Sequence, residues 1–381
     1  MKIVIILPGL AMGGAERVAT SLSNWIAKNK KDEIYFINMG EDTNNFELES
    51  GVKTYHKNYD TKSIKGFKPF VLLKKLKLKI NFVNNILNEI KPDIIFEMLY
   101  VPLFFVLQYK RKNKSDVVLI GSERANPKAK NIKIKTKLMS KICPKLCDGY
   151  IFQTERVKRM FPKKIQEKSI VIPNAVSNPF INEIEQVEKE KIISTMGRLE
   201  EEKAHEILIE AFNIVQKKHP EYKLVIYGEG SKREELEKLI EKLNLKDKVI
   251  LAGKVKKAIL EINKSEIFVF PSRFEGMPNA LMEAMACGLP CISTDCIAGP
   301  SEIIENNKNG ILVEVDNVKQ IAEKTMFLIE NKEKAKNMGN EARKILESHS
   351  TDRIFEKYYN YFIRISKEKE KENVKKVNTK N

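Results

Sequence analysis

The sequence predicts an α/β protein made of two doubly wound parallel sheets. Short β-rich runs alternate with helical patterns in both halves of the chain, and buried-looking strands between helices are typical of a parallel sheet covered on both faces. The length of 381 residues suits about two domains, and 42% hydrophobic residues are enough for a core in each. The most apolar segment, residues 94–107, contains Glu97 and is shorter than the ~18 residues of a membrane-spanning helix.

The second half alternates most regularly. After Lys203, apolar residues at helical spacing mark one helix, which Pro220 ends. Ser231 and Glu234 then form a capping box for the next helix. The strands expected in this half are 192–196, 223–227, 249–252, 267–270, 291–294 and 311–315.

The first half repeats this pattern, and its expected strands are 2–7, 33–37, 93–96, 117–120, 150–152 and 170–172. We therefore expect residues 1–180 to form an N-terminal domain and residues 190–350 a C-terminal one. A last helix, 351–365, precedes a polar tail, 367–381, that we expect to be disordered. Open α/β sheets bind ligands at the carboxyl ends of their strands, so the expected site is the cleft between the domains.

Positive charge is concentrated in the first half. The net charge is +17, and residues 1–180 carry 33 Lys and Arg against 16 Asp and Glu, whereas the remaining residues carry 35 of each. No acidic residue occurs between Asp60 and Glu89, or between Glu123 and Asp148. Such stretches attract polyanions: nucleic acid, an anionic bilayer or a phosphate-bearing substrate.

The first of these acid-free stretches also has an amphipathic pattern. Its apolar residues at helical spacing are Leu72, Leu76, Ile80, Val83 and Leu87. A basic amphipathic helix of this kind is typical of a protein that lies on a membrane surface. The alternative is a surface helix that packs on its own domain with its lysines in water, and the pattern leaves both interpretations open.

The cysteines and the start of the chain indicate a reducing, cytoplasmic location. Five cysteines are an odd number and do not suggest a disulfide framework, and Cys143 and Cys147 have no nearby residues to complete a zinc site. Pro8 and Gly9 interrupt the apolar residues 3–7, so we interpret these as a first strand rather than a signal peptide.

One loop and helix in the second half carry the pattern most informative for chemistry. A predicted strand ends before a loop with Glu275 and Gly276, and Pro278 stands where the first turn of a helix tolerates proline. The free N–H groups of that turn form a ready anion site. Glu283 lies one turn after Asn279, and two carboxylates beside a phosphate site suit a nucleotide sugar, since carboxylates accept hydrogen bonds from vicinal hydroxyls.

Two basic residues are expected at the same sheet edge. Arg198 follows a predicted strand and Lys203 opens the next helix, so both cations can converge near Glu275 and neutralise a diphosphate. His205 lies nearby, but a lone histidine is more often structural. The glycines at 13–14 follow the first strand and suit close approach to a phosphate or an acceptor, although they form neither a P-loop nor a dinucleotide fingerprint.

Together these segments resemble the retaining glycosyltransferases of family four, which have the GT-B fold. The match is near-continuous over residues 192–316. It implies two Rossmann-like domains that face each other across a cleft. The matching segments are Gly-Gly-Ala-Glu-Arg-Val at 13–18, Gly-Arg-Leu and a following lysine at 197–203, Tyr-Gly-Glu-Gly-Ser at 227–231, and the stretch at 270–290.

The resemblance implies a role for each charged residue. Glu283 would hold the ribose hydroxyls, Glu275 would contact the donor sugar, and Arg198 and Lys203 would hold the diphosphate. The last helix would pack back on the first domain. The other donor-binding positions that the resemblance implies are Gly14, Gly276, Met277, Pro278, Asn279, Gly253, Lys254 and Val255.

The sequence departs from this family at one place. Many members carry a histidine near the end of a first-domain strand, but the corresponding segment here, residues 122–127, contains none. We therefore assign Ser122 and Arg124 to the acceptor side of the site and leave their roles open.

The sequence thus predicts a retaining glycosyltransferase of the hexosyltransferase class. It would move a hexose or an N-acetylhexosamine from a nucleotide sugar, UDP-linked by resemblance, to a membrane-associated glycan or a polyprenyl-diphosphate-linked acceptor. Front-face displacement needs no strong protein base, and Arg198 and Lys203 would replace a metal, so neither a metal nor a cofactor is expected. The protein would be cytoplasmic and peripheral on the anionic inner leaflet, where the basic stretches at 62–79 and 124–145 would contact lipid.

Three other functions are alternatives to a glycosyltransferase, and the sequence fits them to different degrees. An enzyme of the same fold that epimerises or hydrolyses a nucleotide sugar fits the same spacing. A non-catalytic basic protein could bind a membrane or nucleic acid, but the basic stretches lack the interleaved aromatic residues of a stacking surface, so no nucleic-acid partner is expected. A nicotinamide oxidoreductase needs a Gly-x-Gly-x-x-Gly after the first strand, and this motif is missing.

Overall fold

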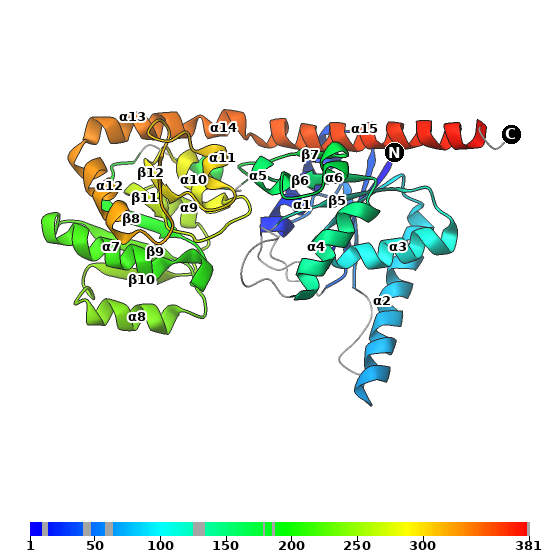
Figure 1. Ribbon diagram of the computed structural model, residues 1–381, viewed down its shortest axis with the longest axis horizontal. Helices are drawn as coiled ribbons and strands as arrows, with labels where there is room; N and C mark the ends of the chain where they lie inside the picture. Colours follow the sequence, from blue (N-terminus) through cyan, green and yellow to red (C-terminus); the bar gives the residue numbers. More distant parts are fainter. Residues whose placement is uncertain are drawn as a thin grey trace. The chain divides into compact units, whose positions relative to one another are not determined.

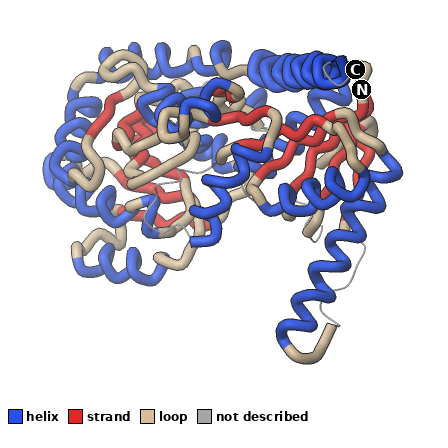
Figure 2. The backbone as a smooth tube through the Cα atoms, turned by 45° about the vertical axis from the view of Figure 1, so that its right-hand side comes forward, coloured by secondary structure: helices blue, strands red, loops and turns tan. Residues whose placement is uncertain are grey.

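The structure is a computed structural model that describes residues 1–9, 14–40, 47–57, 64–124, 134–177, 180–184 and 187–378. The chain divides into two units, each a parallel sheet flanked by helices (Figures 1 and 2). Unit 1 comprises residues 1–173 and 352–381, and unit 2 comprises residues 174–351. None of the helices in the described residues combines the length and the apolar character that a membrane span needs.

The boundary between the units lies earlier than we expected. The sequence suggested that the first domain extends to residue 180, but unit 2 begins at Asn174. Asn174 Nδ2 donates a hydrogen bond to Asn279 Oδ1 at 2.7 Å, and the Val176 N–H donates to the His349 carbonyl at 2.9 Å. These bonds attach the start of the connecting segment to unit 2.

Unit 1 contains a seven-stranded sheet in the order β3-β2-β1-β4-β5-β6-β7, and its strand pairs are parallel. The expected strands are present, and β3 is an additional strand that the sequence analysis missed. Strand β3 lies at the sheet edge and is mostly exposed, so it lacks the apolar run that marks the others. The strands are β1 (Lys2–Leu7), β2 (Glu33–Asn38), β3 (Val52–His56), β4 (Ile94–Met98), β5 (Val118–Ser122), β6 (Gly149–Phe152) and β7 (Ser169–Val171).

The last helix of the chain belongs to unit 1. Tyr358 and Phe362 of this helix are fully buried, and their rings lie 5.9 and 5.1 Å from that of Phe96 in β4. The helix continues to Asn378, so the disordered tail expected from residue 367 is wrong for residues 367–378. The helices of unit 1 are α1 (Gly14–Asn29), α2 (Lys68–Ile90), α3 (Val101–Asn113), α4 (Ile134–Leu146), α5 (Glu155–Lys158), α6 (Lys163–Glu167) and α15 (Thr351–Asn378).

The two halves of helix α2 differ in how far their apolar residues are buried. In its second half, Val83 and Leu87 are fully buried, so this part packs on its own unit. In its first half, Leu72 is 69% exposed, although it belongs to the same apolar stripe. The end of the helix that starts at Lys68 extends away from the rest of unit 1 in both views (Figures 1 and 2).

Unit 2 contains a six-stranded parallel sheet in the order β10-β9-β8-β11-β12-β13. All its strands were expected, with bounds that differ by a few residues, because each contains a short β-rich run between helical patterns. The strands are β8 (Glu190–Met196), β9 (Lys223–Tyr227), β10 (Val249–Gly253), β11 (Ser265–Phe270), β12 (Cys291–Thr294) and β13 (Ile311–Val313).

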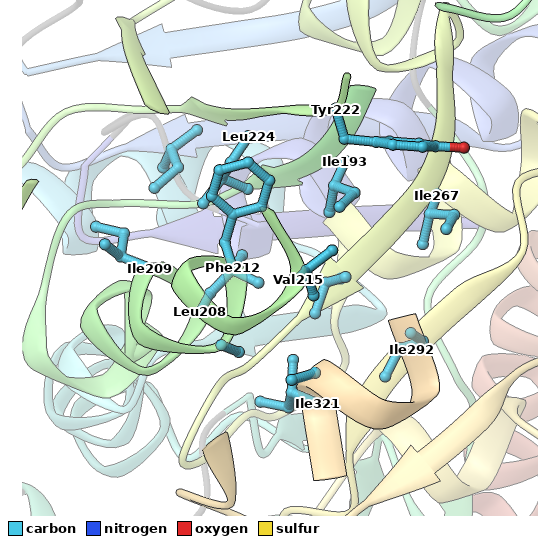
Figure 3. Packing of buried hydrophobic residues seen from close by; sticks show 14 of the residues in the cluster. Ile193, Leu208, Ile209, Phe212, Val215, Tyr222, Leu224, Ile267, Ile292 and Ile321 are labelled. Carbon is cyan, nitrogen blue, oxygen red and sulfur yellow. The ribbon is translucent and has the colours of Figure 1, made fainter. Parts of the chain in front are cut away.

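Helices cover this sheet through apolar faces. Leu208, Phe212 and Val215 of α7 recur at helical spacing and lie close to Ile193 of β8 and Leu224 of β9 (Figure 3). The helical segments of unit 2 are η1 (Ile181–Glu183), η2 (Glu201–Lys203), α7 (His205–Lys218), α8 (Arg233–Lys242), α9 (Ala258–Ile262), α10 (Asn279–Ala286), α11 (Pro300–Ile303), α12 (Val318–Glu330), α13 (Lys332–Arg343) and α14 (Ile345–Ser348).

Candidate functional site

The order of strands in the sheet of unit 2 reverses between β8 and β11. These two strands are neighbours, but the chain continues from β8 to β9 and β10 on one side and from β11 to β12 and β13 on the other. The loops that leave their carboxyl ends therefore diverge, which is where open α/β sheets bind ligands. The loop after β8 carries Arg198 and Lys203, and the loop after β11 carries Glu275.

A direct ion pair joins these two loops. Lys203 Nζ lies 2.5 Å from Glu275 Oε1, and the two side chains are only 17% and 10% exposed. The same ammonium lies 5.3 Å from the centre of the Phe270 ring at the end of β11. Two of the residues predicted from the sequence thus contact each other at the strand-order reversal.

Arg198 is held mainly through its backbone. His205 Nε2 lies 3.2 Å from the Arg198 carbonyl oxygen, which ties the loop after β8 to the start of α7. The guanidinium is 71% exposed and donates to Glu202 Oε1 at 2.6 Å. The side chain is therefore paired within its own loop and accessible to solvent.

His205 occupies a buried position beneath this loop. Burial lowers the pKa of His205 to about 4, and the charge of Lys203 acts in the same direction. The imidazole is therefore neutral at physiological pH. With so low a pKa it is a weak base, so it is unsuited to take a proton in catalysis. This agrees with its interpretation as a structural residue.

The loops after β8 and β9 approach each other closely at a glycine. Gly228 has a φ of +148°, and a Cβ atom there would lie 1.8 Å from the Gly197 carbonyl oxygen. Only glycine fits this contact. The Gly228 N–H donates to the Gly253 carbonyl at 2.8 Å, so the loop with Gly253, Lys254 and Val255, three of the predicted donor-binding residues, lies beside it.

Helix α10 starts beside the Glu275 loop. Its N-cap residue, Pro278, makes no side-chain hydrogen bond to the first turn. The first N–H groups of an α-helix have no partner within the helix, and their dipoles favour an anion. Met277 and Glu283, two further predicted donor-binding residues, are nearly buried at 8% and 6% exposure. Gly276 and Asn279 are partly exposed on either side of Pro278.

Two residues of this sheet edge were missed by the sequence analysis. Arg273 pairs with Glu206 at 2.6 Å and with Asp316 at 2.7 Å, so it connects the loop after β11 to α7 and to the turn after β13. Gly299 has a φ of +95°, and a Cβ atom there would lie 2.6 Å from Pro278 Cδ. The contacts of Arg273 and Gly299 are with residues distant in the sequence, so no short motif could identify either residue.

The remaining predicted residues belong to unit 1. Gly14 is exposed and begins α1, the first helix after β1. Ser122 is the last residue of β5 and is buried, and no described group hydrogen-bonds to its Oγ. Arg124 Nη2 donates to the Tyr358 hydroxyl of α15 at 2.8 Å, so Arg124 also fixes the last helix to unit 1.

Unit 1 contains buried acidic residues that the sequence analysis did not single out. Glu97, at the end region of β4, is fully buried. Burial raises the pKa of Glu97 to about 8, and the nearby Glu123 carboxylate adds to this. Tyr100 donates its hydroxyl to Glu123. Among the described residues, no group of three or more His, Cys, Asp or Glu is arranged to hold a metal ion.

Comparison with known proteins shows similarity to glycosyltransferases. Residues 177–345 match the family model "Glycosyl transferases group 1". The whole chain is similar to an uncharacterised glycosyltransferase of Haemophilus influenzae, with 26% identity over 358 residues, 91% of this chain and 95% of that protein.

Two other relatives are more similar over shorter segments. A poly(ribitol-phosphate) alpha-N-acetylglucosaminyltransferase of Staphylococcus aureus is 37% identical over 174 residues, 45% of this chain and 35% of that protein. An N-acetylgalactosamine-N,N'-diacetylbacillosaminyl-diphospho-undecaprenol 4-alpha-N-acetylgalactosaminyltransferase of Campylobacter jejuni is 37% identical over 155 residues, 41% of this chain and 42% of that protein. This chain therefore spans less than half of either relative.

Solved structures show the fold. S. aureus TarM matches with a TM-score of 0.76 and 19% identity over 95% of this chain and 98% of that one. Anabaena HepE in complex with UDP matches with a TM-score of 0.74 and 15% identity over 94% of this chain and 99% of that one. The second unit thus matches the group 1 glycosyl transferases over residues 177–345, and the chain has the GT-B fold.

Proposed function

We propose that this protein is a retaining glycosyltransferase that uses a UDP-linked sugar as donor. It moves a hexose or an N-acetylhexosamine to a glycan or a polyprenyl-diphosphate-linked acceptor at a membrane surface. The observation that carries the proposal is the Lys203–Glu275 ion pair at the point where the strand order of unit 2 reverses.

The geometry suits a diphosphate. An ammonium group has three N–H donors. Lys203 uses one of them for Glu275, so the other two can bind phosphate oxygens. The exposed guanidinium of Arg198 supplies a second cation from the same loop. The N-terminus of α10 adds backbone N–H groups, so the negative charge of the leaving group has several donors.

The proposed reaction is a front-face displacement. The acceptor hydroxyl attacks the anomeric carbon on the side from which the diphosphate leaves, and a leaving phosphate oxygen takes the hydroxyl proton. The bond from the anomeric carbon to that oxygen breaks as the new glycosidic bond forms. The protein supplies cations and positioning rather than a base, and we propose that Arg198 and Lys203 act in place of a metal ion.

The relatives support the choice of substrates. The S. aureus relative is named as an N-acetylglucosaminyltransferase and the C. jejuni relative as an N-acetylgalactosaminyltransferase with a diphospho-undecaprenol acceptor. A solved structure of the same fold contains UDP. On this basis we assign the donor as a uridine nucleotide sugar. We keep Gly14 among the donor-binding residues and assign Ser122 and Arg124 to the acceptor side.

The charge distribution supports a membrane location. All the excess positive charge lies in residues 1–180, and unit 1 contains most of that segment. An acceptor that carries a diphosphate on a polyprenyl chain would sit at an anionic surface, which attracts such a unit. We propose that the protein is peripheral on the inner face of the membrane.

Thermal shift measurements test the donor site. At 100 times its dissociation constant, UDP or a UDP-sugar should stabilise the protein by about 2.7 kcal/mol. Arg198→Ala and Lys203→Ala should each weaken this binding about 10- to 100-fold, since a hydrogen bond to a charged group contributes about 1.5–3 kcal/mol. Both variants should lose transfer of labelled sugar to a lipid extract, and chelation should leave the wild-type rate unchanged.

Lys217→Ala, on the exposed end of α7, is the matched control and should behave like the wild type. Wild-type UDP binding and turnover in Arg198→Ala would show that this assignment is wrong. Product analysis separates the alternatives of the same fold, because a hydrolase releases free sugar and an epimerase returns a changed nucleotide sugar.

A further inference from the structure

One short segment of unit 1 exposes a cluster of large apolar side chains. The exposed fractions are 72% for Phe67, 65% for Phe70, 69% for Leu72 and 61% for Leu73. The rings of Phe67 and Phe70 lie 6.2 Å apart, so they form one patch. Contiguous exposed apolar groups mark a surface that binds something, whereas scattered single ones do not.

This segment protrudes from unit 1, so it is placed to contact a neighbouring surface. It forms the start of α2, which extends away from the rest of unit 1 (Figures 1 and 2). The far half of the same helix is anchored by buried Phe82, Val83 and Leu87. The exposed side chains of this segment can therefore enter a neighbouring surface while the second half of the helix stays packed on unit 1.

Lysines surround the apolar patch. Lys65, Lys68, Lys74 and Lys75 all lie within or beside it, and the first turn of α2 contains no acidic residue. An open hollow at this end of the helix combines ammonium groups with apolar walls. Its lining residues are Ile64, Lys65, Gly66, Lys68, Val71, Leu72 and Lys75.

We propose that residues 65–75, here named the α2 tip, insert into an anionic lipid bilayer. Phe67, Phe70 and Leu73 enter the boundary between headgroups and acyl chains, and the lysines bind lipid phosphates. This inference deepens the membrane part of the proposed function and rests on it, but it does not depend on the sugar chemistry.

Two other occupants fit the α2 tip less well. A second copy of the chain would bring two lysine clusters together, and like charges at an interface repel. Nucleic acid would satisfy the lysines but would leave Leu72 and Leu73 in water, because phosphates and sugars offer them no apolar surface. A bilayer with anionic headgroups satisfies both the charges and the apolar side chains.

Vesicle flotation tests the proposal with the full chain. We expect the wild type to float with vesicles of phosphatidylcholine and phosphatidylglycerol, much less with phosphatidylcholine alone, and less at high salt. The double variant Phe67→Ser/Phe70→Ser should bind the anionic vesicles at least about tenfold more weakly, since it removes two exposed aromatic side chains from insertion. Lys74→Gln/Lys75→Gln should weaken binding and reduce its salt dependence.

Matched controls lie on unit 2. Ile250→Ser changes an apolar residue that is 44% exposed on β10, and Lys217→Gln/Lys218→Gln removes two exposed lysines from α7. Both controls should float like the wild type. All substituted residues are exposed except Lys75, which is half-buried, so unchanged circular dichroism and UDP binding should accompany any loss of flotation.

Insertion depth gives a second readout. Trp25 is the single tryptophan of the chain and is 8% exposed, so the wild type supplies the fluorescence baseline. In Phe70→Trp, vesicles should shift the added emission to the blue, and lipids brominated on their acyl chains should quench it.

Each outcome decides a different statement. If the wild type binds no anionic vesicles, both the α2 tip and the membrane location are wrong, and UDP binding still tests the transferase. If the wild type floats and Phe67→Ser/Phe70→Ser floats equally, the α2 tip alone is wrong. A wild-type dimer that these serine substitutions dissociate, or binding to duplex DNA that matches binding to vesicles, would also overturn the proposal.

Discussion

Arg198 and Lys203 are held in different ways, although one loop carries both. The Arg198–Glu202 pair is exposed, and such pairs contribute only about 0–1 kcal/mol, so the guanidinium can leave Glu202 for a phosphate at little cost. The Lys203–Glu275 pair is largely buried, and its geometry is set by two loops. We infer that Lys203 is pre-positioned and that Arg198 adjusts to the ligand.

The sequence analysis singled out candidate residues that stand together in one contiguous segment. Glu275, Pro278 and Glu283 stand in a strand–loop–helix pattern that predicts its own geometry. Arg273 looked like any loop arginine, because its partners Glu206 and Asp316 come from other elements. A residue that joins distant loops gives no spacing signal.

His205→Gln should remove a pH-dependent loss of stability. The pKa of His205 is about 4 in the folded state against an ordinary value of 6.5, so between these values the unfolded chain binds a proton that the folded chain does not. Stability is therefore complete above about pH 6.5 and falls by about 3 kcal/mol as the pH drops toward 4. A glutamine cannot gain this charge, and its amide can still donate to the Arg198 carbonyl.

Urea unfolding of wild type and His205→Gln at about pH 4.5 and about pH 7.5 measures this difference. The free energy of unfolding should change less with pH in the variant. The same pH dependence in both proteins would mean that His205 is not the titrating group.

At the scale of elements, burial decided what could be predicted. Strand β12 is fully buried and β9 is buried after Lys223, and the structure places both at the residues expected. Strand β3 escaped because an edge strand exposes much of its length. The helical extension beyond residue 366 escaped because its contact is polar: Lys369 Nζ bonds Asp148 Oδ2 at 2.7 Å.

The expected capping box at Ser231 and Glu234 is wrong for a tertiary reason. Helix α8 has Lys232 as its N-cap, and no side chain caps it. The Ser231 hydroxyl instead donates to Glu200 Oε2 at 2.7 Å, in the loop after β8. A partner on another loop outcompetes the local pattern, as is common for serine.

Gly228→Ala should distort the contact between the loops after β8 and β9. An added Cβ atom would overlap the Gly197 carbonyl oxygen, and alanine rarely adopts this backbone conformation. We expect a loss of about 2–4 kcal/mol in the free energy of unfolding, together with weaker UDP binding, because Arg198 moves with Gly197.

Gly197→Ala is the neighbouring control. A Cβ atom there would meet its nearest heavy atom at 3.5 Å, an ordinary van der Waals contact. Its cost in stability should be below that of Gly228→Ala, as measured by denaturant unfolding. Equal costs for the two variants would contradict this account of the glycine.

At the scale of the whole molecule, unit 1 is discontinuous in sequence, because its last helix follows the segment that forms unit 2. Residues 174–351 form unit 2, and α15 then adds its aromatic face to unit 1. The resemblance implied this return, whereas the hydrophobic pattern alone showed only that a last amphipathic helix exists. No local signal specifies which of two sheets a terminal helix covers.

Ending the chain after Ser350 should therefore unfold unit 1 but not unit 2. It removes three fully buried aromatic residues, Phe355, Tyr358 and Phe362, and loss of each costs about 3–5 kcal/mol, together comparable to the 5–15 kcal/mol stability of a domain. A cooperative urea transition of the Trp25 fluorescence reports on the folding of unit 1. The emission of the unperturbed protein does not, because the shorter chain lacks Asp352 and Phe355, which contact the indole. UDP-induced stabilisation reports on unit 2. A chain ended after Ser366 keeps all three aromatic residues and should retain both signals. A cooperative Trp25 transition in the chain ended after Ser350 would show that unit 1 folds without its last helix.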